Sequence, residues 1–127
     1  MDPAVRELAT DSGVLRTVHG QRFGAGYAAI AFAFERATLR LDCNADTDEI
    51  MARADPSPSD LPEVVDDQML SSLVGKVIEQ AWTMRNHRGF ADAFQLRCLD
   101  VVNRDEVCLQ FEAAAATMTL MQVTELM

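Results

Sequence analysis

The residues best suited to chemistry flank a single turn, between Trp82 and Asp92. Asn86, His87 and Asp92 supply an amide, an imidazole and a carboxylate, and Trp82 is the only tryptophan of the chain. If the flanking segments pair as strands, these side chains lie within roughly 10 Å of one another. A small-molecule or hydrolytic pocket needs such convergent polar groups beside apolar surface.

A structural interpretation of the same residues competes with the binding site. In it, Trp82 fills the core, while Asn86 and Asp92 hydrogen-bond the backbone of the turn. The interpretation is favoured because apolar and β-branched residues precede the turn and an apolar pattern of period two follows it. The candidate binding surface is therefore Trp82, Asn86, His87 and Asp92, and no catalytic residue is predicted.

Two other stretches resemble ligand loops but lack required residues. Residues 20–26 are glycine-rich, yet a phosphate-binding loop ends in Gly-Lys-Ser/Thr and a dinucleotide loop has another glycine spacing. Asp46 and Asp48 begin as a calcium loop does, but Ile50 stands at the next ligand position and the later glycine and glutamate are missing. We interpret both stretches as turns, so neither a cofactor nor a metal ion is predicted.

The charge of the chain restricts its partners. Twenty acidic residues against 11 basic ones give a net charge of −9. This field repels nucleic-acid phosphates and anionic lipid, so we expect neither a nucleic-acid nor a membrane partner. A basic protein partner fits the charge.

Cysteine usage and the N-terminal sequence point to the cytoplasm. The three cysteines are odd in number, and none forms a C-x-x-C motif, which argues against a disulfide framework or a zinc site. We expect them to behave as small buried hydrophobic residues. Acidic residues stand where a signal peptide would be basic, and no uncharged apolar run approaches about 18 residues.

The pattern of apolar residues predicts a chain made mostly of short strands. A proline-rich stretch at 53–62 is expected to be irregular. A short helix capped by Asp66 or Asp67 should follow it through Val74, with Gly75 as its stop, and 3–9 is a second candidate helix. The expected strands are 14–18, 30–34, 38–42, 50–52, 77–84, 90–98, 107–112 and 117–123.

The two halves of the chain resemble each other in order and spacing. Residues 39–51 align without a gap with residues 109–121, which favours a strand at 117–123 over a helix that continues from the preceding alanines. Duplication and two unrelated meanders of similar rhythm both remain open. Either origin yields one α+β domain over 1–127 that is mostly antiparallel β. Its expected parts are two β-meander halves (14–52 and 75–124), a connector (53–74) and one or two short helices.

Part of the sequence resembles a known family. The first half carries Phe34, Leu39, Asp46, Asp48, Glu49 and Ile50, and the second carries Gly75, Lys76 and the pattern Trp-x-x-x-Asn-x-x-Gly-Phe-x-Asp-x-Phe-x-Leu from Trp82 to Leu96. From residue 30 onward, the chain resembles small bacterial proteins that are known only as a domain of unknown function. The resemblance implies a bacterial cytoplasmic α+β protein and brings no activity, cofactor or catalytic residue with it.

Two functions follow as expectations. The first is a non-catalytic protein-interaction module of the immunity or adaptor type in the bacterial cytoplasm, which the acidic charge and the lack of catalytic motifs favour. The second is a small-molecule-binding or hydrolytic domain with a pocket near Trp82, Asn86 and Asp92. A homodimer is also expected, because residues 117–123 form a terminal strand with apolar groups on both faces.

Overall fold

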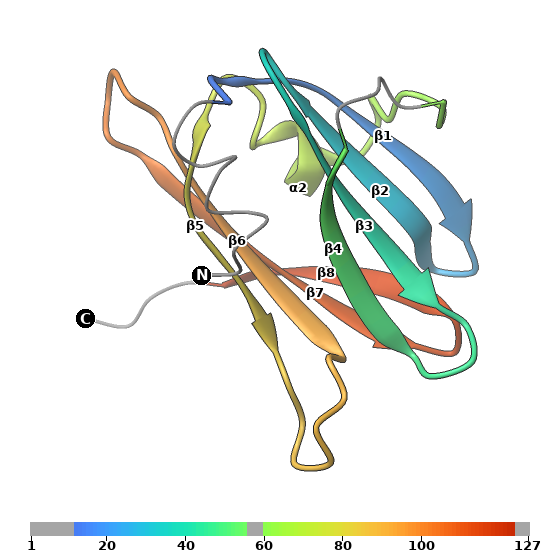
Figure 1. Ribbon diagram of the computed structural model, residues 1–127. Helices are drawn as coiled ribbons and strands as arrows, with labels where there is room; N and C mark the ends of the chain where they lie inside the picture. The colour runs from blue at the N-terminus through green and yellow to red at the C-terminus, as the bar shows by residue number, and fades with distance from the viewer. Residues whose placement is uncertain (1–11, 56–59, 124–127) are drawn as a thin grey trace.

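The computed structural model describes residues 12–55 and 60–123, and within them eight strands form one antiparallel sheet (Figure 1). The only helix in these ranges is α2, which is a single turn long. The elements are β1 (Leu15–Phe23), β2 (Gly26–Phe34), β3 (Thr38–Asn44), β4 (Glu49–Asp55), α2 (Gln68–Ser71), β5 (Val77–Met84), β6 (Ala93–Leu99), β7 (Glu106–Ala114) and β8 (Thr117–Val123).

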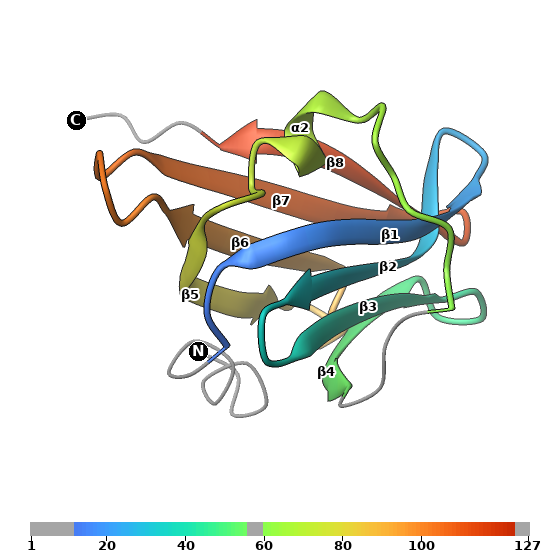
Figure 2. The same ribbon diagram turned by 90° about the horizontal axis from the view of Figure 1, so that it is seen from above.

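The sheet consists of two four-stranded meanders that meet at β2 and β8. Each strand of β1–β4 pairs with its neighbour in the chain, and the same holds for β5–β8. The meanders join where Tyr27 pairs with Met118. Figures 1 and 2 show the two meanders as facing walls of a barrel-like sheet, with α2 at one end.

Hydrogen bonds outside the regular ladders hold the walls together. At one end, the Leu15 amide donates to the Lys76 carbonyl at 2.8 Å, and the Gly75 amide donates to the Leu15 carbonyl at 2.8 Å. At the other end, the Ile50 amide donates to the Ala91 carbonyl at 2.7 Å. The two walls therefore share backbone bonds in addition to the Tyr27–Met118 pairing.

Two carboxylates of the β3–β4 turn add side-chain bonds between the walls. Asp48 accepts a hydrogen bond from the Ala116 amide at 2.9 Å, and Glu49 accepts one from the Ala91 amide at 3.0 Å. Asp48, considered above for a calcium loop, thus binds a backbone amide of the second meander, as Glu49 does. Within the described ranges, no group of three or more acidic, histidine or cysteine side chains is placed to hold a metal ion.

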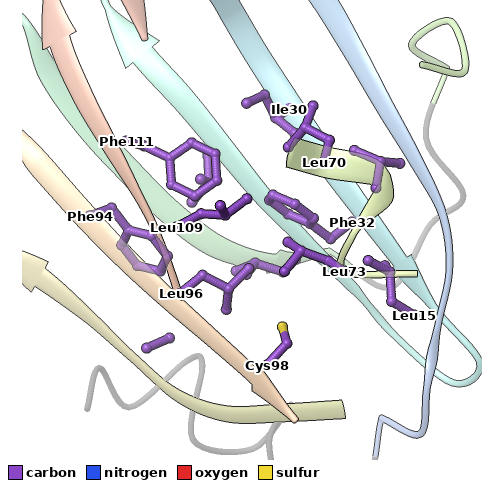
Figure 3. Packing of buried hydrophobic residues seen from close by; sticks show 14 of the residues in the cluster. Leu15, Ile30, Phe32, Leu70, Leu73, Phe94, Leu96, Cys98, Leu109 and Phe111 are labelled. Atoms are coloured by element: carbon purple, nitrogen blue, oxygen red, sulfur yellow. The ribbon is translucent and has the colours of Figure 1, made fainter. Parts of the chain in front are cut away.

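The core lies between the walls and is built from the inward residues of both (Figure 3). The Phe32 ring, from the first meander, meets the Phe111 ring of the second edge-on at 5.9 Å between centroids. Leu70 and Leu73 close one end of this core, and both are fully buried. Asp67 caps the short helix by accepting from the Leu70 amide, as its sequence position predicted.

Most of the predicted strands are confirmed, including β5 with its predicted bounds and β8 in place of a helix. Gly89 closes the β5–β6 turn at φ 86°, as expected for its left-handed position. The mostly antiparallel β class is confirmed as well. The α+β description is not, because the described helix has four residues. The candidate helix at 3–9 lies outside the described residues.

Two further expectations are wrong. The glycine-rich stretch continues β1 as far as Phe23, because Gly20 leaves room for the Tyr27 ring, whose Cδ1 would lie 2.9 Å from a Cβ at that position. β4 extends through 53–55, where an irregular connector was expected, since these residues pair with β3. β8 pairs along its whole length with β7 but with β2 only where Tyr27 meets Met118, so residues 119–123 have no second strand partner among the described strands. The homodimer stays a prediction.

The β7–β8 turn offers a test of backbone strain. Ala115 and Ala116 have φ values of 53° and 65°, in the left-handed region that costs an L-residue about 1–2 kcal/mol. We expect Ala116→Gly to raise the free energy of unfolding by about 0.5–1 kcal/mol, since relief of strain exceeds the entropy that glycine adds to the unfolded chain. Urea unfolding followed by circular dichroism measures this change. Ala114→Gly, one step before the turn in β7, should instead lower stability, and an equal loss in both variants would contradict the assignment.

The β2–β8 junction offers a second test. A Cβ at Gly26 would lie 2.0 Å from the Met118 carbonyl oxygen, which is backbone and cannot rotate away. We expect Gly26→Ala to destabilise the protein by about 1–3 kcal/mol or more, as overpacked sites do. Gly24→Asn is the control, because nothing lies within 4 Å of that position and asparagine tolerates its left-handed φ. Equal midpoints of thermal unfolding for both variants would show that the junction can relax.

Candidate functional site

The β5–β6 turn brings Asn86 and Asp92 together and uses both within the turn. The Asn86 side-chain amide donates to the Asp92 carboxylate at 3.2 Å. The Asn86 side-chain oxygen accepts from the amides of Arg88 at 2.9 Å and Phe90 at 3.2 Å. The predicted bonds from Asn86 to the turn backbone are confirmed. For Asp92 the partner is different from the expected backbone N–H groups, because its carboxylate meets the Asn86 side chain.

Trp82 does not fill the core, contrary to expectation. It is half-buried on the outer face of the second meander, opposite Gln95, while Ile78 and Ala81 face inward. The cause is a register shift between Ile78 and Gln80, which moves the alternation of β5 by one residue. Without it, Trp82 would share the inward face of Ile78.

His87 is exposed at the tip of the turn. No hydrogen bond to its ring is found in the described part of the chain. The four sequence candidates thus separate into a bonded pair, a histidine at the tip and a tryptophan on the outer sheet face.

Sequence reasoning missed a second polar group, which lies where residues 60–67 run along β1. We call these residues the strap. The Gly20 amide donates to the Pro62 carbonyl at 2.9 Å, and the Val64 amide donates to the Val18 carbonyl at 2.8 Å. The His19 ring adds a contact, with its Nδ1 3.0 Å from the Leu61 carbonyl oxygen. The strap is therefore attached to the sheet beside β1, opposite β2.

A groove of about 470 Å³ opens where the strap and the end of β1 separate. Its size falls within the range of about 300–1,000 Å³ that is typical of ligand sites. Two exposed carboxylates and an exposed valine stand beside the buried Val64 there. The lining residues are Gly20, Gln21, Arg22, Pro62, Glu63, Val64, Val65 and Asp66.

Arg22 and Tyr27 support the groove from β1 and β2. The Arg22 guanidinium pairs with the Asp66 carboxylate and lies 5.3 Å from the centre of the Tyr27 ring. The Tyr27 hydroxyl donates to Asp67 at 2.8 Å. Burial, followed by this hydrogen bond, raises the pKa of Tyr27 to about 12, so the hydroxyl remains protonated at neutral pH.

The electrostatics of the strap are one-sided. It carries Asp60, Glu63, Asp66 and Asp67 and no basic residue. Arg22 compensates Asp66, and Arg40 lies 3.8 Å from Asp60, but both of these strap carboxylates remain largely exposed. A cationic group is the natural complement of this surface.

The thiols of Cys98 and Cys43 are poor nucleophiles. Burial raises the pKa of Cys98 to about 12 and also raises the pKa of Cys43, so little thiolate is present at neutral pH. Cys98 and Cys108 are buried, as expected, and Cys43 is only partly so. Nucleophilic attack by the Cys98 or Cys43 thiol is therefore disfavoured at neutral pH.

The chain matches the model of a family described as "Family of unknown function (DUF6334)" over residues 5–127, and it belongs to that family. The resemblance to a family of unknown function that the sequence suggested is thus confirmed. No curated protein and no solved structure matches the chain. In the ranges that the structure describes, no helix has the length and apolar character needed to cross a bilayer.

Tyr27 is the only tyrosine of the chain, so its titration can be followed alone by absorbance at 295 nm. We expect a pKa of about 12 in the folded protein. Because this value lies above the ordinary 10.0, the stabilisation is complete below pH 10 and is lost as the pH rises through about 12. Asp67→Asn should lower the pKa and still cap α2, and Asp66→Asn should lower it less. A pKa of 10.0 in the native protein would contradict the buried hydrogen bond.

Proposed function

We propose that this protein is a non-catalytic interaction module, of the immunity or adaptor type, that binds a basic segment of a partner protein at the strap groove. The observation that carries the proposal is the groove itself, where the Glu63 and Asp66 carboxylates stand beside Val65, whose exposed fraction is 74%. An exposed valine between two carboxylates suits a partner that presents both apolar and basic side chains. Charge then selects the partner and speeds its approach.

The net charge of −9 supports the same class of partner. It opposes contact with nucleic acid and anionic membranes, whereas a basic protein is attracted over about a Debye length, roughly 8 Å at physiological salt. The bacterial cytoplasm is the setting we propose. It fits an acidic protein whose Cys98 and Cys108 thiols are buried rather than paired.

The pocket domain considered from the sequence has weaker support. Asn86 and Asp92 bind each other within a turn, and Trp82 lies in β5 on the outer sheet face. The polar groups are thus engaged in holding the turn. We therefore place the partner site at the strap and not at this hairpin.

The test uses a short synthetic peptide of Lys-Thr-Val-Thr repeats and its Glu-Thr-Val-Thr counterpart. We expect the lysine peptide to bind in fluorescence anisotropy, with an affinity that falls as salt rises, and the glutamate peptide not to bind. Glu63→Gln should weaken binding by about two- to fivefold, as expected when one exposed ion pair is lost.

Asp105→Asn is the matched control, because it removes the same charge from an exposed residue of the β6–β7 loop. If both variants weakened peptide binding equally, binding would depend only on the net charge of the protein and not on the strap. Failure of the lysine peptide to bind at low salt would refute the proposal.

A further inference from the structure

We infer that the partner segment binds in extended form, as an additional β-strand on the outer edge of the strap at Glu63. This inference rests on the proposed function and extends the partner's contact from the groove, on the β1 side of the strap, to the opposite edge of the strap. It is carried by the hydrogen-bond pattern between the strap and β1.

The strap pairs with β1 as one antiparallel bridge, His19 with Glu63. Its two bonds use the Pro62 carbonyl and the Val64 amide, which flank Glu63 on either side. In an antiparallel ladder, the residue between such a pair of bonds directs its own N–H and C=O away from that partner strand. Glu63 therefore presents a donor and an acceptor on the edge opposite β1.

That edge is open in the described part of the chain. No hydrogen bond to the Glu63 backbone is found there, and the Glu63 side chain is exposed. The neighbouring side chains alternate, since Val64 is buried at 8% exposure and Val65 is exposed at 74%. Residues 62–64 thus pair with β1 as an edge strand does, and the alternation puts Glu63 and Val65 on one face.

This alternation defines the chemistry of the partner. A residue opposite Glu63 meets a carboxylate, and a residue two positions away meets Val65 on the same face. The partner segment that fits is extended and has a basic residue, then a residue of any type, then an apolar residue. Backbone bonds then supply affinity and the two side-chain positions supply selectivity, as in other cases of strand addition.

Glu63 also protects the edge from indiscriminate pairing, because its negative charge stands beside the open edge, a feature that keeps edge strands from aggregating. Two copies of the strap would set Glu63 against Glu63, which disfavours self-pairing. A basic segment is attracted to the Glu63 carboxylate, whereas a second strap is repelled by it.

Amide hydrogen exchange, read residue by residue by NMR, tests strand addition with the Lys-Thr-Val-Thr peptide. In the free protein, the Glu63 amide should exchange rapidly, while the bonded Gly20 and Val64 amides exchange slowly. At saturating peptide, we expect exchange at Glu63 to slow by about tenfold or more. If the peptide binds and the Glu63 amide still exchanges at its free rate, strand addition is wrong and the proposed function stands. If the peptide does not bind, both are wrong.

Backbone methylation of the peptide supplies an independent measurement. One version carries N-methyl groups on its lysines and valines, and the other carries them on its threonines. Only one set of amides can face the strap, so one version should lose binding and the other should retain it. Loss with lysine and valine methylation would indicate antiparallel pairing, and the reverse would indicate parallel pairing. Equal affinities of the two versions would overturn the inference.

Discussion

The contact between Gly26 and the Met118 carbonyl is the constraint on which the rest of the sheet depends. The two meanders pair with each other as strands through Tyr27 and Met118, and a side chain at Gly26 would occupy the space of that carbonyl. Because the walls meet at this point, their inner faces enclose one continuous core that includes Phe32 and Phe111. The strap and α2 cover one end of this core (Figure 2).

The strands were predictable from the sequence where each one obeyed a simple alternation. β6 and β7 place their inward residues at period two, and both were found. The prediction failed at Trp82, because the shift between Ile78 and Gln80 leaves no signal in residue type. It failed at Gly20 for a different reason. A glycine in a strand looks like a break until the aromatic ring that needs its space is known, and Tyr27 is adjacent only in the folded chain.

The candidate site was only partly accessible from the sequence. The acidic residues of the strap were visible as a run with no basic residue, but their neighbours suggested a solvated connector. The pairing of the strap with β1 depends on backbone bonds from Gly20 and Val64, and backbone bonds between distant segments carry little sequence signature. By contrast, the Asn86 turn was readable, because Asn and Gly at its two ends have local conformational preferences.

The hydrogen bonds of Asp48 and Glu49 join the two meanders through backbone groups. Each carboxylate recognises a backbone amide of the other meander, at Ala116 and Ala91, and not a side chain. Every residue type except proline provides that amide. The residues at positions 116 and 91 can therefore be replaced without a compensating substitution in the first half. Only the two acidic residues and the backbone shape of the opposite turns must be kept. Relatives of this protein can thus differ widely around those turns and still hold their halves in the same registration.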